Sequence, residues 1–478
     1  MTMKTHSASV IVPVPSNIRL TNEKFPLDHL RHWYLDPDFA VLAPELEKLF
    51  RTLDIDCTPS AENEADFILR KGPDPVPDVW RMTVTSSGIA AEAGERSGAR
   101  YVFDALTQML FASVLVAGRG SAVLDGAVIR DIPRFTWRGF HLDSARHFQN
   151  TATIKRVLRV LAHFRINVFH WHLTDNQGWR FAGKTVPLLD GEGTWSNGQY
   201  TPDDLREIAG FARDLGIRIV PEVDVPGHSA RLLAKYPQFA CDPADPGSEW
   251  CLGNPESLEF LKRLFSELMD LFPDSPVIHI GGDEAETDHW EKCPKCQAAM
   301  RERNLRSMRE LENDFMVRLS RFVVERGRSP MIWGTCSGQV YPPDTIIQVW
   351  LDIREPLKIA ASGNKMVYSV HNSLYFDYPA NLSEAWEPWM FELSERGVYM
   401  TEPYIIWPKK VKNLMLGTEA CLWTEAVPQH RVMSKIFPRI FAYSECAWSA
   451  PERKSYADLV RRRELLEASG LTDYLKDF

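Results

Sequence analysis

From residue 135 onward, short apolar runs alternate with stretches whose apolar residues recur at helical spacing. The runs are rich in β-branched residues and apolar on both faces, as expected of strands covered on both sides. They lie at residues 136–142, 166–173, 217–223, 277–280, 331–333, 345–351, 366–370 and 414–422, with helical patterns at 153–164, 202–215, 255–272, 309–326, 383–396 and 434–447. Eight strand-then-helix units predict an α/β chain with a (β/α)8 TIM barrel. A doubly wound sheet is less favoured, because no Gly-x-Gly-x-x-Gly follows the first strand.

The region before the barrel has a mixed pattern. A strand-like run at 10–14, a helical stretch at 37–53, alternating runs at 67–69 and 80–84 and an amphipathic helix at 101–116 predict a smaller α+β domain. The glycine-containing stretch 118–134 is predicted to be the linker. We therefore divide the chain into an accessory domain, residues 1–130, and a barrel domain, residues 134–478.

Polar and aromatic residues follow the predicted barrel strands at their carboxyl ends, where such a barrel builds its active site. They are Asp143, Arg146, His172, Asp175, Glu222, Asp224, His228, Asp283, Glu284, Trp333, Trp350, Asp352, Tyr375, Asp377, Trp423 and Glu425. Tryptophan faces stack on the C–H faces of sugar rings, and carboxylates accept hydrogen bonds from hydroxyls. The pattern favours a carbohydrate pocket at this end of the barrel.

The most informative strand end is PVIHIGGDEAE at residues 276–286. Gly281 and Gly282 permit backbone conformations that bend the chain after an apolar strand. Neighbouring side chains of a regular strand point to opposite faces, so a twist at the glycines would let Asp283 and Glu284 reach different atoms of one ligand. Taken alone, the two acids could equally meet water or cap the next helix.

Composition narrows the classes of function. The chain has 64 acidic and 55 basic residues without a dense Lys/Arg stretch, which argues against a nucleic-acid partner. We expect no membrane-spanning helix, because no apolar run approaches the required length. The N-terminus has no apolar core followed by a small-residue cleavage site, so the chain as written is expected to be cytoplasmic. A chain that had lost an export signal would look the same.

The chain contains eight cysteines. Cys293 and Cys296 form the only C-x-x-C, and without a second pair at zinc spacing we expect no structural metal. No thioredoxin-like context suggests a redox role. Cys241 and Cys251 flank an Asp/Pro/Gly loop and would form a disulfide in an exported protein but remain thiols in a reducing compartment. The other four, Cys57, Cys336, Cys421 and Cys446, are interpreted as buried thiols.

Six motifs, in order along the chain, resemble those of the family 20 β-N-acetylhexosaminidases. They are RGFHLDSARHF (138–148), FHWHLTDNQGWR (169–180), PEVDVPGHS (221–229), HIGGDE (279–284), SLYFDYP (373–379) and CLWTE (421–425). The similarity covers about residues 134–449, and GARYVFDALTQML (98–110) resembles the end of that family's accessory domain. The resemblance implies an exo-acting hydrolase that removes terminal β-linked N-acetylglucosamine or N-acetylgalactosamine from a small-molecule or oligosaccharide substrate, without metal or cofactor.

The same resemblance implies a substrate-assisted mechanism, in which the sugar's own acetamide oxygen attacks the anomeric carbon. It assigns Glu284 as general acid and base, Asp283 as the group that orients the acetamide, and Tyr375 as a donor to the acetamide oxygen. Physical reasoning agrees, because one of two adjacent carboxyls in a closed pocket has a raised pKa, which suits a proton donor.

Further roles are implied by the motif positions. Arg138 would bind ring hydroxyls, Asp377 and Glu425 would accept hydrogen bonds from hydroxyls, Trp333, Trp350 and Trp423 would wall the acetamide pocket, and Asp175 and His228 would support the acid. The chain departs from the family in one motif, because Trp333 is followed by Gly334 and Thr335 instead of two acids. Preference for the leaving group near that loop is therefore open, and Trp386 or Trp389 is a further candidate stacking wall.

Two other classes remain as alternatives. His170-Trp171-His172 at a strand end is also typical of metal-dependent amidohydrolases, although the further ligands such a site needs are not evident. A carbohydrate-binding barrel without catalysis is the second alternative, and the intact pair of acids argues against it. A chelator separates the first alternative from a hexosaminidase, whose mechanism requires no metal.

Overall fold

The computed structural model describes residues 6–74, 76–118, 121–187, 197–334, 341–351, 354–384, 387–404 and 407–476. All eleven predicted site residues lie within these ranges. Thr335, Cys336, Asp352 and Trp386 lie outside them.

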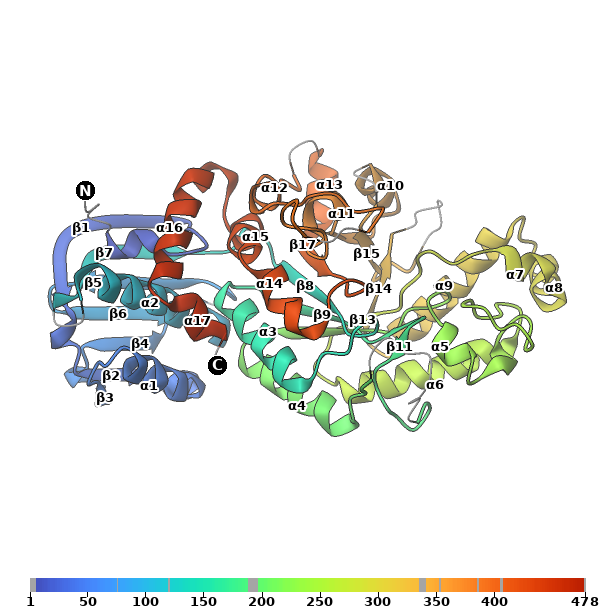
Figure 1. Ribbon diagram of the computed structural model, residues 1–478, viewed down its shortest axis with the longest axis horizontal. Helices are drawn as coiled ribbons and strands as arrows, with labels where there is room; N and C mark the ends of the chain where they lie inside the picture. Colours follow the sequence, from blue (N-terminus) through green and yellow to red (C-terminus); the bar gives the residue numbers. More distant parts are fainter. Residues whose placement is uncertain are drawn as a thin grey trace.

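Eight parallel strands close into a barrel at the centre of the molecule (Figure 1). They are β8 (Trp137–Asp143), β9 (Val168–His172), β12 (Arg218–Glu222), β13 (Val277–His279), β14 (Ser329–Trp333), β15 (Ile346–Val349), β16 (Lys365–Tyr368) and β17 (Met415–Leu422), and β17 pairs with β8. Each of the eight predicted runs overlaps one of them, so the predicted barrel is confirmed. An apolar layer of Trp137, Val168, Val220, Val277, Met331, Ile346 and Val367 fills the barrel interior below the strand ends.

Helices follow the barrel strands, and most of them cover the outside of the barrel. The long ones are α3 (Thr151–His163), α4 (Pro202–Asp214), α6 (Pro255–Leu271), α9 (Met308–Glu325) and α15 (Arg439–Trp448); the shorter ones are α5 (Ala230–Leu233), α7 (Asp288–Lys292), α8 (Pro294–Glu302), α10 (Glu355–Ser362), α11 (His371–Leu374), α12 (Glu395–Tyr399), α13 (Lys409–Leu414) and α14 (Val432–Ile436). A side chain at each N-cap of α3, α4, α6 and α9 accepts a hydrogen bond from the first turn, which explains why these helices begin where polar caps precede the apolar pattern. A short hairpin, β10 (Thr174–Asp175) with β11 (Gly178–Trp179), follows β9.

Two predicted helices differ from the structure. In the described part of 383–396, most of the stretch has no regular secondary structure and only α12 begins there, because Pro388 lacks the N–H that a helix interior needs. The pattern at 434–447 is divided into α14 and α15, with Pro438 between them.

The N-terminal part forms a seven-stranded sheet in the order β1-β7-β5-β6-β4-β2-β3. Its strands are β1 (Asn17–Pro26), β2 (His32–Leu35), β3 (Thr58–Pro59), β4 (Phe67–Lys71), β5 (Trp80–Thr85), β6 (Gly88–Ala93) and β7 (Val123–Asp131), and its helices are α1 (Ala43–Thr52) and α2 (Arg96–Ala117). The predicted strand at 10–14 is wrong, because Pro13 and Pro15 cannot donate to a ladder. The predicted linker is also wrong over most of its length, since β7 lies within it and pairs with β1 and β5.

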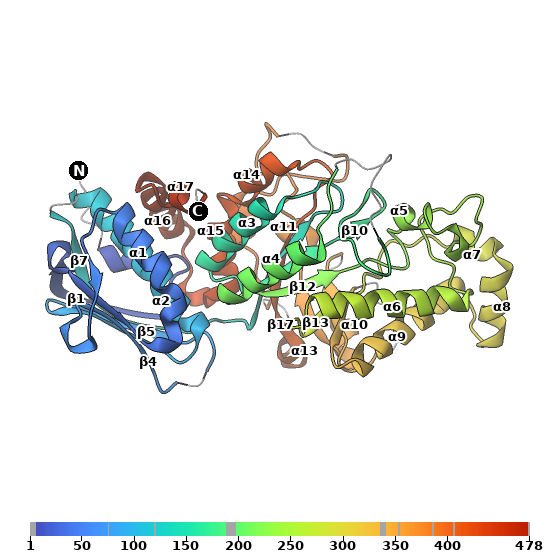
Figure 2. The same cartoon turned by 90° about the horizontal axis from the view of Figure 1, so that it is seen from below.

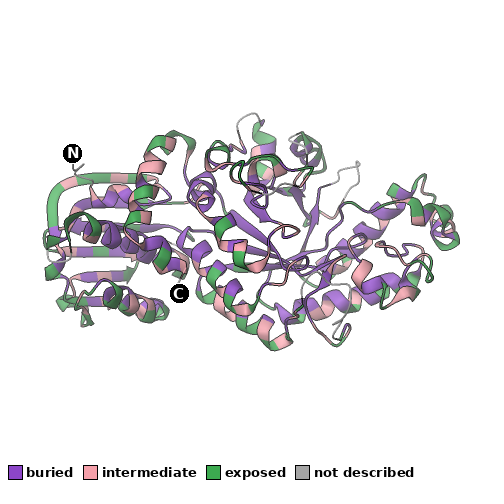
Figure 3. Ribbon diagram, in the orientation of Figure 1, coloured by how far each residue is buried: buried purple, intermediate pink, exposed green. Residues whose placement is uncertain are grey.

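Helix α2 was expected to be an ordinary amphipathic helix, yet among the described helices it alone is long and apolar enough to cross a membrane. In this structure 83% of its most apolar window is buried (Figure 3). The helix therefore serves as a core element of the N-terminal domain.

The N-terminal domain covers the amino ends of the barrel strands. Asp131, at the end of β7, accepts hydrogen bonds from the indole of Trp448 (3.1 and 3.2 Å) and pairs with Arg165, which precedes β9. The C-terminal helices α16 (Tyr456–Ala468) and α17 (Leu471–Lys476) lie beside α2 in both views (Figures 1 and 2). Since the amino ends are covered, the opposite rim of the barrel is where a pocket opens.

Candidate active site

The loop after β13 has the sharp geometry that its two glycines predict. Gly281 and Gly282 adopt φ values of +73° and +108°, and Glu284 has a φ of +48°. A Cβ on Gly281 would lie 1.8 Å from Oδ1 of Asp224, so only glycine fits there. The bend separates the two acids: the side chain of Asp283 is 9% exposed, whereas that of Glu284 is 59% exposed.

A cavity of about 590 Å³ opens at this end of the barrel. Eight of the predicted site residues line it: His228, Asp283, Glu284, Trp350, Tyr375, Asp377, Trp423 and Glu425. The others that line it are Arg146, Gln177, Leu351, His371, Tyr378 and Trp389. The structure thus brings together residues that follow seven different barrel strands.

Asp283 lies deep in this cavity. Burial, together with the nearby carboxylates Glu222 and Glu284, raises the pKa of Asp283 to about 6, and Asp224 forms a hydrogen bond with it. One of its oxygens, Oδ1, has no hydrogen-bond partner among the described residues. Asp283 therefore lines the cavity with one buried oxygen still able to accept a hydrogen bond.

Glu284 stands at the end of a chain of three side chains. Nε2 of His228 lies 3.6 Å from Oε2 of Glu284, and Nδ1 of His228 lies 3.1 Å from Oδ1 of Asp175. Burial alone would lower the pKa of His228, but Asp175 and Asp224 raise it well above its usual value. The nearby His228 cation in turn lowers the pKa of Glu284. The raised pKa expected for the proton donor is thus found on Asp283, because Glu284 is open to water and faces a cation.

The aromatic floor is built in two layers. Trp423 and Trp350 line the cavity, and the ring of Tyr375 lies 6.2 Å from that of Trp423. Trp333 is only 1% exposed and is absent from the cavity wall; its ring lies 5.6 Å from that of Trp423, and its indole donates to Glu222 at 2.7 Å. Burial raises the pKa of Tyr375 well above its usual value, so its hydroxyl remains a donor.

Acceptors and one cation line the other side of the cavity. Burial beside Glu425 raises the pKa of Asp377 to about 8, and burial also raises the pKa of Glu425. Arg146 lies between the acids, with Nη2 2.9 Å from Asp175 and 3.6 Å from Glu425, and its guanidinium lies 5.1 Å from the ring centroid of Trp423. This arrangement can hold hydroxyl groups from several directions.

The assignment of Arg138 is corrected by the structure. Arg138 is the second residue of β8, fully buried at the amino end of the barrel. It donates to Asp78 (3.0 Å), to the hydroxyl of Tyr101 (2.9 Å) and to the backbone oxygens of Phe135 and Arg165 (both 2.7 Å). It therefore joins the barrel to the N-terminal domain and cannot reach the pocket.

The arginine that lines the pocket is Arg146. Its position after the first barrel strand predicts a place at this rim, whereas the motif resemblance points to Arg138. Of the two candidate stacking walls, Trp389 lines the cavity and is 59% exposed, while Trp386 lies outside the described residues. Gln177 and Tyr378 lie within the quoted motifs at 169–180 and 373–379 but had no predicted role, and His371, the first residue of α11, lies outside every motif.

The paired histidines of the strand end at 170–172 do not form an open metal site. His172 bonds Glu222 with one nitrogen and Asp175 with the other (2.9 Å), while His170 bonds Glu419 at 2.7 Å. Burial alone would lower the pKa of His170, but the carboxylates of Glu419 and Glu222 raise it to about 9. These imidazoles and carboxylates satisfy one another beneath the floor of the pocket.

Hydrolysis of a glycosidic bond needs a proton donor and a second group that faces the sugar from another direction. The loop after β13 supplies both at the rim of a barrel, so fold and site together define a glycoside hydrolase. Comparison with known proteins gives the family. Residues 135–451 match the model of the glycosyl hydrolase family 20 catalytic domain, and the chain belongs to this family.

Individual relatives agree. The chain is 31% identical over 409 residues to a beta-hexosaminidase of Akkermansia muciniphila, covering 80% of this chain and 82% of that one. It is 29% identical over 466 residues to a beta-hexosaminidase of Vibrio furnissii, covering 90% of this chain and 75% of that one. Among solved structures, a family 20 exo-β-N-acetylglucosaminidase of Vibrio harveyi, in complex with N-acetylglucosamine, superposes with a TM-score of 0.87 at 27% identity and covers 99% of this chain and 79% of that chain.

A β-N-acetylhexosaminidase of Bacteroides fragilis superposes with a TM-score of 0.84 at 25% identity, covering 97% of this chain and 96% of that chain. These findings confirm the predicted family, fold class and enzyme class, and they support β-hexosaminidase activity on a small-molecule or oligosaccharide substrate. They favour neither the amidohydrolase nor the carbohydrate-binding alternative.

Proposed function

We propose that the protein is an exo-acting β-N-acetylhexosaminidase that removes terminal non-reducing N-acetylhexosamine with retention of configuration, through participation of the substrate's acetamide. The observation that carries the proposal is the division between the two acids of one loop. Asp283 is buried beside Asp224, and Glu284 is exposed at the mouth of the same cavity. One acid is thus available to the acetamide and the other to the leaving group.

The first half of the reaction breaks the bond between the anomeric carbon and the glycosidic oxygen. Glu284 donates its proton to that oxygen while the acetamide oxygen attacks the anomeric carbon, forming an oxazolinium ring. Asp283 accepts a hydrogen bond from the acetamide N–H and offsets the positive charge that develops there. The Tyr375 hydroxyl donates to the acetamide oxygen and holds it in line for attack.

In the second half, water attacks the anomeric carbon and loses its proton to Glu284, which reopens the ring. Two inversions at the same carbon retain its configuration. The His228 cation keeps Glu284 ionised in the open pocket. A bound substrate covers Glu284 and removes water, and this raises the pKa of its carboxyl toward the value a proton donor needs.

Recognition of a terminal sugar follows from the far wall of the cavity. Arg146, Asp377 and Glu425 bind the ring hydroxyls. Trp350 and Trp423 contact the acetamide and the face of the sugar ring, and Trp333 packs beneath Trp423. The Vibrio harveyi relative, an exo-β-N-acetylglucosaminidase in complex with N-acetylglucosamine, supports this class of substrate.

The test compares release of 4-nitrophenol from its β-N-acetylglucosaminide, its β-N-acetylgalactosaminide and its β-glucoside, with and without EDTA. We expect turnover of acetamido sugars only, unaffected by the chelator. Asp283→Asn and Glu284→Gln should each lower kcat at least about 100-fold, the usual scale for a lost charge-stabilising or acid–base group. Glu286→Gln, an exposed carboxylate on the same loop, is the matched control. Equal turnover of the β-glucoside would show that an enzyme carboxylate is the nucleophile and would refute the proposal.

A further inference from the structure

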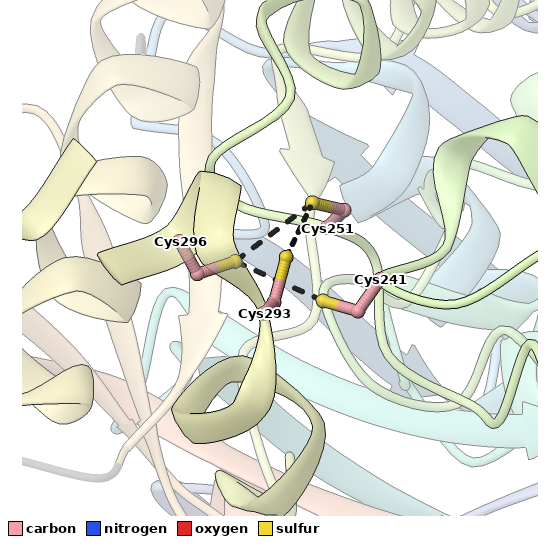
Figure 4. Close-up of side chains that lie close together, drawn as sticks. All are labelled: Cys241, Cys251, Cys293 and Cys296. Atoms are coloured by element: carbon pink, nitrogen blue, oxygen red, sulfur yellow. Dashed lines mark hydrogen bonds between the residues drawn. The ribbon is translucent and has the colours of Figure 1, made fainter. Parts of the chain in front are cut away.

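Four cysteines from two separate loops meet at one point outside the catalytic cavity (Figure 4). Cys241 follows the short 3-10 turn Pro237–Phe239, and Cys251 comes shortly before α6. Cys293 is the N-cap of α8 and Cys296 lies in its first turn. All four sulfurs lie within 4.8 Å of one another, and all four residues are free thiols.

The spacing of the sulfurs is that of a tetrahedral metal site. Cys241 and Cys296 are 3.7 Å apart, Cys251 and Cys293 are 3.7 Å apart, and Cys251 and Cys296 are 3.8 Å apart. In a tetrahedral zinc site with zinc–sulfur bonds of about 2.3 Å, neighbouring sulfurs are roughly 3.8 Å apart. The three separations therefore match the edges of such a tetrahedron, with all four corners supplied by the protein.

The surroundings of the sulfurs suit bound thiolates. Cys251, Cys293 and Cys296 are at most 4% exposed, which leaves little access for water. The backbone N–H of Gly253 donates hydrogen bonds to the sulfurs of Cys251 and Cys296, as outer groups around a metal site do. A Cβ on Gly253 would lie 2.2 Å from the backbone of Lys295, so a glycine is required for the two loops to approach this closely.

We propose that Cys241, Cys251, Cys293 and Cys296 together bind one structural zinc ion. The site is closed, with four protein ligands and no open position, so its role is to hold structure. The sequence-based expectation of no metal overlooked it because the second pair is separated by nine residues instead of two. Only the fold brings that pair against the C-x-x-C.

The ion would join the two loops that carry the catalytic acid and its partner histidine. Helices α5 to α9 extend from the barrel on the side away from the N-terminal sheet (Figures 1 and 2). Beside Cys251, the indole of Trp250 donates to Ser229 Oγ (2.9 Å), and the backbone N–H of Trp250 donates to the Pro226 carbonyl (2.9 Å), close in sequence to His228. The indole of Trp290, near Cys293, donates to the Trp250 carbonyl (2.9 Å). Zinc would thereby fix the separation between His228 and Glu284.

The experiment measures metal content in the full chain, expressed in zinc-supplemented medium and purified without chelator. We expect about one zinc per chain by inductively coupled plasma mass spectrometry, lost in Cys293→Ser/Cys296→Ser and retained in Cys57→Ser, whose thiol lies outside the cluster. Wild-type protein unfolded in guanidinium should release this zinc to a chromogenic chelator and should then show every cysteine as a free thiol. The second measurement needs no variant, so it decides the matter even if the double variant fails to fold.

Metal-free protein with four free thiols, iron in place of zinc, or a disulfide between any two of the four cysteines would overturn the proposal. None of these readings depends on turnover, so the outcome is separate from that of the proposed function. Because three of the sulfurs are buried, EDTA at neutral pH should leave the ion in place and the glycosidase test undisturbed.

Discussion

Two arginines eight residues apart should respond to the same substitution in opposite ways. Arg138 joins the barrel to the N-terminal domain, and Arg146 lines the cavity. We expect Arg138→Lys to lower stability without changing catalysis, and Arg146→Lys to lower catalysis with the smaller effect on stability. Lysine keeps the charge in both cases but replaces a planar fork of donors with a single ammonium.

The magnitudes follow from the contacts. Arg138 makes four hydrogen bonds in a fully buried position, and one ammonium cannot reach partners spread over a guanidinium. Each buried acceptor left without a partner costs about 1–3 kcal/mol, so we expect a loss of about 2–4 kcal/mol in the free energy of unfolding. For Arg146, losing one charged hydrogen bond to a sugar hydroxyl, worth about 1.5–3 kcal/mol, lowers kcat/KM roughly 10- to 150-fold.

The assay pairs urea unfolding with kinetics on the aryl β-N-acetylglucosaminide, at a temperature where both variants are folded. Arg138→Lys should unfold at lower urea concentration with kcat/KM within about twofold of wild type, the scatter expected of a residue outside the site. The reasoning is refuted if Arg138→Lys loses catalysis at unchanged stability, or if Arg146→Lys retains wild-type kcat/KM.

Three further predictions concern groups in the cavity. The pKa of Asp377 is raised to about 8 in the folded state, whereas the unfolded chain ionises this carboxyl at a lower pH. The free energy of unfolding should therefore fall by roughly 3–4 kcal/mol between pH 5 and pH 8. Urea titrations of wild type and Asp377→Asn should show a flatter pH dependence in the variant. His228→Asn should move the basic limb of the kcat/KM pH profile upward, since the nearby His228 cation lowers the pKa of Glu284; an unmoved limb would contradict this effect of His228 on Glu284. Trp389→Ala should leave the thermal midpoint unchanged, because the residue is 59% exposed, but should raise KM several-fold for a chito-oligosaccharide; an equal effect on the aryl substrate would place Trp389 outside leaving-group binding.

Much of the barrel could be predicted because its strands are buried on both faces and leave an unbroken apolar signal. The strand at 277–280 was found within one residue of β13, and the long helices began at recognisable caps such as Thr201, whose capping box with Asp204 the structure contains. Prediction failed where prolines interrupt apolar or helical patterns, at 10–14 and 383–396. At these positions proline lacks the backbone N–H that a helix interior or a strand ladder needs, so the apolar pattern alone predicts the wrong element.

The site was predicted by position more reliably than by motif. Residues in the connections after barrel strands, such as Tyr375 and Glu425, line the cavity, because parallel strands of a closed barrel end at one rim. Trp333 follows the same rule yet lies beneath Trp423, since depth within the rim depends on packing. Arg138, chosen from its motif, lies at the other end of its strand.

The sequence by itself determined the class of fold, the pair of acids after β13 and the family, because each is recorded in local order and spacing along the chain. Only the tertiary structure decided which arginine faces the substrate, which of the two acids has the raised pKa, and that Cys241 and Cys251 meet Cys293 and Cys296. Proton affinity depends on burial and neighbouring charge, and metal coordination depends on distances between four atoms in space. Neither quantity exists until the loops are folded against one another.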